Sequence, residues 1–155
     1  SADAAEAATL LETALRLIEL RHDHVVFRRS RYLHGQTIPG TDVSDVTWLT
    51  ADGREMKDSD WNDPARLTLQ VLLNGQAGNR FLTEDGQPEP DDTFLLVFHS
   101  AYDPANVTLP PAVTGTCWIA EIDTSGQLPV TGCTDGAATL TVSGRSVIVF
   151  RQGEA

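Results

Sequence analysis

The hydrophobic pattern of this chain has helical spacing near its beginning. From residue 10 to residue 18 the apolar side chains fall within one arc of about 160° on a helical projection. Thr9 and Glu12 fit a capping box, which would start a helix at Thr9. Glu12 and Arg16 form an i,i+4 pair, and a C-terminus near His22 suits a basic last turn. We predict an amphipathic helix whose apolar stripe consists of Leu10, Leu11, Ala14, Leu15, Leu17 and Ile18.

Beyond residue 40 the hydrophobic period changes to two. Residues 67–73 and 118–122 alternate as half-buried strands do, and the alternation directs Trp48 and Trp118 inward. Residues 93–99 are apolar almost throughout, which is typical of a central strand that is covered on both faces. Residues 140–142 and 147–150 complete about seven strands. This spacing predicts a mainly β fold, an antiparallel Greek-key β-sandwich preceded by one long N-terminal α-helix.

Length and charge limit the possible functions. A chain of 155 residues can bury one core without metal or disulfide support. Its net charge of −11 lies entirely in residues 32–155, because acids and bases balance in residues 1–31. Arg28, Arg29 and Arg31 are the single basic cluster, and pairing with nearby carboxylates explains them better than a nucleic-acid site. We expect no binding to nucleic acid or to a membrane, and no apolar run approaches the roughly 18 residues of a membrane span.

The candidate catalytic and metal-ligating groups do not form known patterns. Asp58, Asp60 and Asn62 match the first ligands of a calcium loop, but position six is not glycine and position twelve is not glutamate. A helix N-cap at Ser59 or Asp60 explains these residues without a metal. The segment 22–24 has two histidines but no third ligand nearby, and the segment 99–103 lacks a nucleophile elbow. We therefore predict no metal, no cofactor and no catalytic residue.

Four segments together resemble one protein family. They are RLIELRHDHVVFRRSRYLHG at residues 16–35, the run from residue 45 through TADGREM, KDSDWNDP and LTLQVLLNG to residue 75, DDTFLLVFHSAYDPANVTLPP at residues 91–111, and RSVIVF at residues 145–150. The chain resembles the C-terminal end of a bacterial glycogen debranching enzyme of the isoamylase type, in the α-amylase superfamily. The resemblance implies that residues 1–35 are the last helix and exit segment of an upstream catalytic barrel, and that residues 36–155 form the C-terminal sandwich.

This resemblance also implies a function and a location. The chain would be a non-catalytic accessory domain, bracing the barrel of an enzyme that hydrolyses α-1,6 branch linkages in glycogen. The family is cytoplasmic, so Cys117 and Cys133 are expected to be free thiols, although a bridge across a hairpin is open to them. The apolar stripe would contact the barrel or, in its absence, a second copy in a homodimer.

Exposed aromatic rings leave two other classes of function open. Trp61 and Tyr102 are predicted to lie in loops, where they could stack on glucose rings in a carbohydrate-binding module. The spacing of strands and turns also fits a secreted Ig-like interaction domain. Binding to glycogen would favour the first rival, and a disulfide would favour the second.

Overall fold

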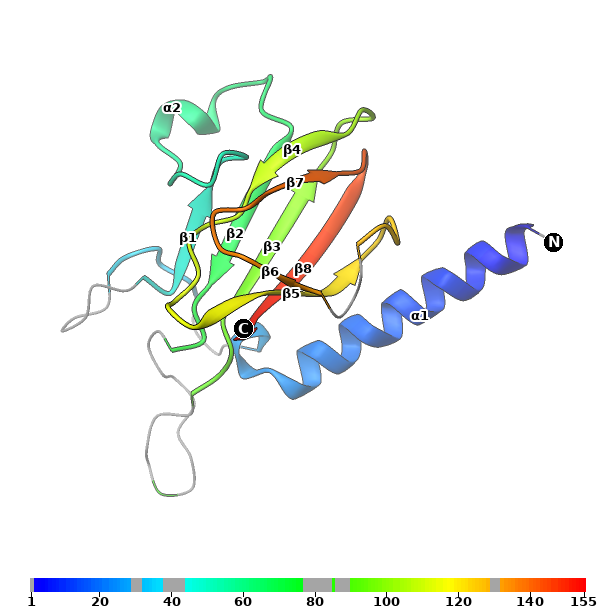
Figure 1. Ribbon diagram of the computed structural model, residues 1–155, viewed down its shortest axis with the longest axis horizontal. Coiled ribbons are helices and arrows are strands. Elements are labelled where there is room, and N and C mark those ends of the chain that lie inside the picture. Colours follow the sequence, from blue (N-terminus) through cyan, green and yellow to red (C-terminus); the bar gives the residue numbers. More distant parts are fainter. Residues whose placement is uncertain (1, 29–31, 38–43, 77–84, 86–89, 129–131) are drawn as a thin grey trace.

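The computed structural model describes residues 2–28, 32–37, 44–76, 85, 90–128 and 132–155 (Figure 1). In this part of the chain one long helix precedes a β-rich domain. The elements in chain order are α1 (Ala2–Asp23), η1 (Val25–Phe27), β1 (Val46–Leu49), α2 (Asp58–Trp61), β2 (Thr68–Leu73), β3 (Phe94–His99), β4 (Ala105–Thr108), β5 (Thr116–Asp123), β6 (Cys133–Thr134), β7 (Thr139–Val142) and β8 (Ser146–Glu154).

The strands form two antiparallel sheets. The large sheet has six strands in the order β1-β2-β3-β8-β5-β6, and β4 pairs with β7 in a second sheet of two strands. In Figure 1 the small sheet covers one face of the large sheet, and α1 extends away from the domain toward its N-terminus. The predicted mainly β sandwich with one N-terminal helix is confirmed. The short strands β4 and β6 were not predicted.

The main core lies between the two sheets. It unites residues from β1, β3, β4, β5, β7 and β8, including Trp118 and Phe150, which are each 1% exposed. The inward orientation predicted for Trp118 is therefore confirmed. Gln70 of β2 also faces this core, and its amide nitrogen donates to the carbonyls of Thr50 at 2.8 Å and Thr108 at 2.9 Å. These hydrogen bonds satisfy the amide nitrogen, whereas the buried Oε1 of Gln70 has no hydrogen-bond partner among the described residues.

A second core occupies the opposite face of the large sheet. Leu20 of α1 and Val26 of η1 pack there against strand residues that include Phe94 and Val149. On β3, Phe94 belongs to this core whereas Leu95 belongs to the main core. Both faces of β3 are thus covered, as its continuous apolar sequence predicts. The prediction that β2 is half-buried is wrong, because its alternate residues enter the two cores.

Strand β5 contains a β-bulge that the alternating pattern did not reveal. Ala120 pairs with Phe150 and Ile122 pairs with Val149, so Glu121 is an extra residue between two neighbouring pairs. The pattern predicted Trp118, Ala120 and Ile122 on one face. The bulge shifts Ile122 into the second core, while Trp118 and Ala120 stay in the main core.

Helix α1 begins earlier than predicted. It starts at Ala2, and the hydroxyl of Thr9 donates to the carbonyl of Ala5 at 3.1 Å inside the helix. Thr9 is therefore not an N-cap, and the predicted capping box is wrong. Alanine has the highest helix propensity, and residues 2–8 contain five alanines, so the helix begins well before the potential start signal at Thr9. The predicted end near His22 is confirmed, since α1 ends at Asp23.

Candidate interaction surfaces

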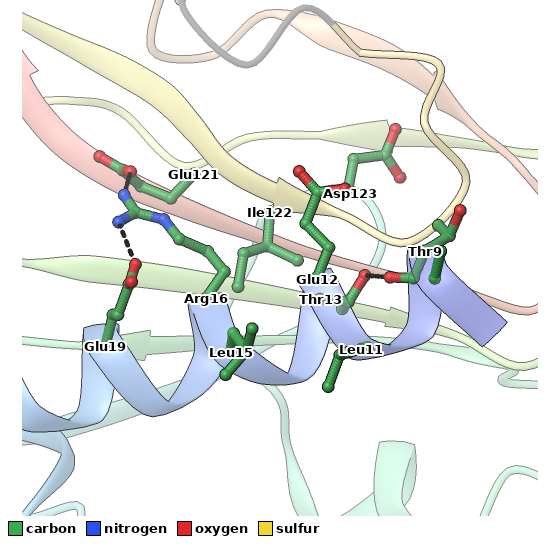
Figure 2. A pocket seen from close by; sticks show the side chains of 11 residues that line it. Thr9, Leu11, Glu12, Thr13, Leu15, Arg16, Glu19, Glu121, Ile122 and Asp123 are labelled. Carbon is green, nitrogen blue, oxygen red and sulfur yellow. Dashed lines mark hydrogen bonds and ion pairs between the residues drawn. The ribbon is translucent and has the colours of Figure 1, made fainter. Parts of the chain in front are cut away.

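An ion pair connects α1 to the large sheet. Nη2 of Arg16 lies 2.6 Å from Oε2 of Glu121, and Nη1 of Arg16 lies 3.4 Å from Glu19 (Figure 2). Arg16 therefore pairs with Glu19 and Glu121, not with Glu12 as predicted. Oε1 of Glu121 accepts a second hydrogen bond of 2.6 Å from Nε of Arg151. Glu121 lies on the face of β5 opposite Ala120, toward the helix, where both guanidinium groups reach it.

The electrostatics of this ion pair favour the charged forms. Burial alone would raise the pKa of Glu121, but the hydrogen bonds from Arg151 and Arg16 outweigh burial and leave this pKa below its usual value. The hydrogen bond to Glu121 raises the pKa of Arg16. The Glu121 side chain is only 10% exposed whereas the Arg16 side chain is 43% exposed. The contribution of this ion pair to stability therefore depends mainly on Glu121, the more buried partner.

Most of the predicted apolar stripe of α1 is not packed on the sheet, although Leu17 lines a cavity there with Leu20 and Val149. Leu20, which packs into the second core, lies about half a turn around the helix axis from Leu11 and Ile18. The exposed fractions are 61% for Leu11 and 63% for Ile18. The remaining members of the stripe are Leu10 at 71%, Leu15 at 52%, Leu17 at 47% and Ala14, which is half-buried. Helix α1 thus has one side on its own domain and a separate apolar side open to a partner.

A carboxylate fixes the exit from α1. Asp91 accepts hydrogen bonds from the backbone N–H of Val26 and contacts Nδ1 of His24, both at 2.7 Å. His22 instead pairs with its neighbour Asp23 at 3.0 Å on the surface. The two histidines of segment 22–24 therefore serve different local contacts. This separation agrees with the structural role that the sequence suggested for them.

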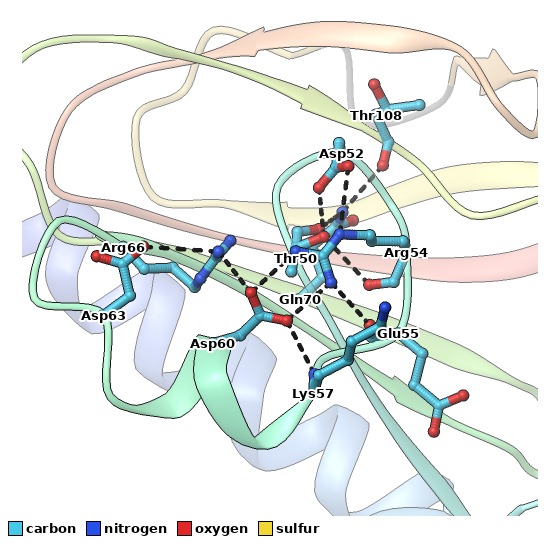
Figure 3. A network of polar contacts seen from close by, with 10 residues as sticks. All are labelled: Thr50, Asp52, Arg54, Glu55, Lys57, Asp60, Asp63, Arg66, Gln70 and Thr108. Atoms are coloured by element: carbon cyan, nitrogen blue, oxygen red, sulfur yellow. Dashed lines mark hydrogen bonds and ion pairs between the residues drawn. The ribbon is translucent and has the colours of Figure 1, made fainter.

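A buried carboxylate organises the segment between β1 and β2. Asp60 binds both terminal nitrogens of Arg54, at 2.7 and 2.9 Å, and Nη2 of Arg66 at 2.7 Å (Figure 3). It also accepts the backbone N–H of Lys57 at 2.8 Å. The hydrogen bonds from Arg54 and Lys57 hold the pKa of Asp60 far below its usual range. Four donors around one carboxylate fix α2 firmly to the strands.

The observed network corrects the expected N-cap of α2. The helix starts at Asp58 and its N-cap is Lys57, not Ser59 or Asp60. Asp60 occupies the third helical position and caps the helix by accepting the N–H of Lys57. Asn62 donates to the carbonyl of Asp58 at 3.1 Å, so its side chain also serves the helix.

Two tryptophans meet at the surface beside this network. The rings of Trp48 on β1 and Trp61 on α2 lie 5.4 Å apart at an angle of 73°. Trp48 is 37% exposed and Trp61 is 53% exposed. The inward orientation predicted for Trp48 is wrong, because α1 and η1 cover the face at Val46 but not at Trp48. Trp61 is exposed as predicted.

Tyr102, the second expected carbohydrate contact, is also exposed, at 77%. Its ring packs under the guanidinium of Arg145, which lies 5.2 Å from the ring centre. Trp61 and Tyr102 thus make separate contacts. No feature of the sequence indicated Trp48 as the partner of Trp61, because the alternating pattern predicted that Trp48 faces the core.

His99 has no nucleophile to activate. Its Nδ1 contacts the hydroxyl of Thr68 at 2.8 Å, and its Nε2 contacts the backbone carbonyl of Asp103 at 2.7 Å. The hydroxyl of Ser100 donates to the carbonyl of Leu67. Both ring nitrogens are occupied by structural partners, which confirms that segment 99–103 is not a triad.

The two cysteines are bridged, so the expectation of free thiols is wrong. Cys117 and Cys133 form a disulfide with their Cα atoms 5.7 Å apart. The cause is the pairing of β5 with β6, in which Ile119 lies opposite Cys133. This pairing brings Cys133, which is exposed, within reach of Cys117, which is buried.

The described residues also bear on metal binding and on membrane insertion. No group of three or more His, Cys, Asp or Glu side chains in the described ranges is arranged to hold a metal ion. Among the helices of these same ranges, none is both long and apolar enough to cross a membrane. The basic cluster at residues 28–31 and the acidic loop at residues 76–92 fall largely outside the described residues.

Comparison with known proteins gives one informative similarity. The chain is 35% identical over 149 residues to the glycogen operon protein GlgX homologue of Mycobacterium bovis, and equally to that of Mycobacterium tuberculosis. The match covers 94% of this chain but only 20% of the relative, so the chain spans about one fifth of the length of these proteins. No family model matches the chain. The resemblance to one part of a bacterial glycogen-operon protein is confirmed.

Solved structures give more distant similarities. A pullulanase from Anoxybacillus sp. LM18-11 aligns with 92% of this chain and 15% of its own length, at 15% identity and a TM-score of 0.49. The trehalulose synthase MutB of Pseudomonas mesoacidophila MX-45 aligns with 59% of this chain and 13% of its own, at 19% identity and a TM-score of 0.36. Both TM-scores are below 0.5, so neither alignment establishes a shared fold.

Proposed function

We propose that this chain is a non-catalytic accessory domain of a longer enzyme, which hydrolyses α-1,6 branch linkages in glycogen or related glucans. The observation that carries the proposal is the identity of 35% over 149 residues with mycobacterial glycogen-operon proteins that are about five times as long. The four segments that resemble debranching enzymes point the same way. In this proposal the catalytic groups and the cytoplasmic location belong to the longer protein.

The carboxylates of the described chain support a non-catalytic role. Glycoside hydrolysis needs two carboxyl groups about 5–9.5 Å apart on either side of the bond, with one pKa raised. Here the pKa of Asp60 is lowered by arginine and backbone donors. The pKa of Asp123 is also lowered, since hydrogen bonds from Leu128, Ser125 and Gln127 outweigh its burial. Neither carboxyl group has the raised pKa that a general acid needs, and the hydrogen bonds that lower both pKa values hold loops in place.

Helix α1 supplies the contact with the rest of the longer protein. We infer that residues 1–35 are the last helix and exit segment of a catalytic barrel, whereas residues 36–155 form the accessory sandwich. The Arg16–Glu121 pair and Leu20 hold the helix on the sandwich, and Leu11 and Ile18 are turned to the other side. A helix with these two sides can join the two domains rigidly, which braces the barrel.

The disulfide favours one rival function, a secreted Ig-like interaction domain. Disulfides are rare in the cytoplasm and common in secreted domains. The similarity to glycogen-operon proteins outweighs this observation, because it extends over nearly the whole chain whereas the bridge concerns one pair of strands.

The experiment is a comparison of activity in the chain alone and in the longer protein. The purified chain should release no reducing sugar or linear chains from glycogen, and the longer protein should release both. Asp58→Asn and Asp60→Asn variants of the chain serve as controls for contaminating activity. Turnover by the chain that survives repurification and disappears in either variant would overturn the non-catalytic role.

A further inference from the structure

The exposed tryptophan pair has the features of a binding platform. Trp48 and Trp61 come from different elements, and their rings form a corner of 73° with centres 5.4 Å apart. Each indole leaves a large apolar surface in contact with solvent. Exposed aromatic pairs of this size on a well-packed domain mark sites of recognition more often than chance exposure.

The platform is held rigid from below. The backbone N–H of Met56 donates to the carbonyl of Trp48 at 2.8 Å, which fixes the turn after β1 against that strand. Directly before Trp61, the carboxylate of Asp60 is bound by Arg54 and Arg66 (Figure 3). Both indoles thus project from backbone that is already ordered, so a ligand would bind without the entropy cost of ordering it.

A small pocket adjoins Trp61, with a lining that is both polar and apolar. Its volume is about 130 Å³, which is room for about four water molecules. Within the described residues, Nε of Arg66 is buried in the side-chain packing and has no hydrogen-bond partner. A group the size of a water molecule does not reach Nε, so the pocket offers a ligand the exposed part of the guanidinium, in a side chain that is 22% exposed. The lining residues are Met56, Asp60, Trp61, Asp63, Arg66, Thr68 and Leu69.

The surrounding charges indicate an uncharged ligand. The acidic side chains of Asp63 at the cavity and of Asp58 and Glu55 nearby disfavour phosphate and other anions, and Asp60 already neutralises part of the arginine charge. A sugar ring meets all these conditions, because its C–H face packs on an indole while its hydroxyl groups accept from a guanidinium. A protein segment would fill the indole surface but would bring no small acceptor to the guanidinium of Arg66 unless a side chain entered the pocket.

We propose that Trp48, Trp61 and Arg66 form a binding site for one or two glucose units of a neutral α-glucan chain. The indoles supply the stacking surface, and the partly exposed guanidinium of Arg66 donates to a sugar hydroxyl in the pocket. The choice of glucose rests on the proposed function. The site would hold a branch of the polymer on the accessory domain, away from the reacting bond.

The test is a titration of the purified chain with maltoheptaose, followed by tryptophan fluorescence and by NMR of the indole N–H groups. Binding is expected in the millimolar range, and Trp61→Ala should weaken it about tenfold. Arg66→Lys keeps the positive charge but removes the guanidinium, so it should weaken binding about threefold or more. Tyr32→Ala, which removes a ring that is 90% exposed in another segment, should change the affinity less than about twofold.

Failure of this proposal can be separated from failure of the proposed function. If the longer protein cleaves glycogen but the chain shows no response up to about 50 mM maltoheptaose, the platform is overturned and the accessory role stands. If acrylamide does not quench these two indoles in the sugar-free longer protein, they form a domain contact, and the platform is again overturned. Binding to maltoheptaose by a chain whose longer protein does not cleave α-1,6 linkages would overturn the proposed function alone.

Discussion

Arg16 of α1 and Glu121 of β5 are 105 residues apart in sequence and 2.6 Å apart in space. Alternation alone places Glu121 on the face of β5 opposite Ala120, which is the face that α1 covers. The extra residue at the bulge adds Ile122 to this face, so Ile122 packs under the helix beside the Arg16–Glu121 pair. The contact between α1 and the domain thus combines one regular and one irregular feature of the sheet.

Replacement of Glu121 tests this contact. Glu121→Gln should lower the free energy of unfolding by about 1–2 kcal/mol at pH 7, because two arginine hydrogen bonds to a nearly buried carboxylate are weakened. Urea unfolding measures the loss, and hydrogen exchange should show faster exchange in α1. Glu19→Gln is the matched control, since the Glu19 side chain is 62% exposed and its replacement should cost less than about 0.5 kcal/mol.

The effect of pH on the same pair follows from the lowered pKa of Glu121. A carboxyl group with a lowered pKa in the folded state stabilises the fold above its unfolded pKa, near 4.5, and this stabilisation is lost as the pH falls through the folded pKa. The difference in stability between the parent chain and Glu121→Gln should therefore shrink below pH 4.5. A difference that stays constant from pH 7 to pH 3 would contradict the assignment.

The disulfide gives a second prediction. Protein purified without reductant should show no free thiol after unfolding and a mass 2 Da below that of the reduced chain. Reduction should lower the free energy of unfolding by about 2–4 kcal/mol, because the bridge closes a loop across a sequence separation of 16 residues. Cys133→Ser should match the reduced protein. Full labelling of both cysteines in unreduced, unfolded protein would show that the bridge does not form in solution.

Much of the fold could be predicted from the sequence because it follows from local periodicity. The continuous apolar run of β3 indicated a central strand, and it is covered on both faces. The start of α1 could not be predicted correctly from the sequence. Thr9 has the side chain of an N-cap residue, but the helix propensity of the alanines before it outweighs the stabilisation that an N-cap would give. The bulge at Glu121 has no local signal, since it depends on how β5 pairs with β8.

The surface features were harder to predict because they depend on what covers each face. The position of Trp61 in an exposed segment could be read from its polar neighbours. The exposure of Trp48 could not be read in this way. An alternating pattern identifies the face of a strand on which a side chain lies, but not how far a helix extends over that face. The unpaired Nε of Arg66 depends on three side chains that meet only in the folded chain.

Glycine at position 53 offers a third prediction. Gly53 has φ +79°, and a Cβ atom there would lie 2.8 Å from the carbonyl oxygen of Thr108. Gly126 has φ +68° but has open space around it. Gly126→Ala should therefore cost about 1 kcal/mol from the backbone conformation alone, whereas Gly53→Ala should cost about 2–4 kcal/mol. If urea unfolding shows the same loss of unfolding free energy for both variants, the turn at Gly53, beside Trp48, moves to accommodate the added methyl group.

The exposed stripe of α1 leads to the last prediction. Leaving four large apolar side chains in water forgoes roughly 6–12 kcal/mol of burial, which is comparable to the stability of a whole domain. The chain alone should therefore pair through Leu11 and Ile18 with a second copy in a two-fold dimer. Sedimentation equilibrium should show a dimer that dissociates on dilution.

Variants of the stripe distinguish this dimer from nonspecific association. Leu11→Glu and Ile18→Glu should each give a monomer, whereas Val113→Glu, at a position that is 65% exposed outside α1, should leave the dimer intact. Measured on the monomer at low concentration, none of the three should lower the free energy of unfolding by more than about 0.5 kcal/mol, since all three positions are exposed in the single chain. In the longer protein the same two α1 variants should lower the temperature at which the barrel unfolds, because the proposed function places the stripe against the barrel. A monomer at all concentrations, together with an unchanged barrel in the longer protein, would show that the stripe has neither partner.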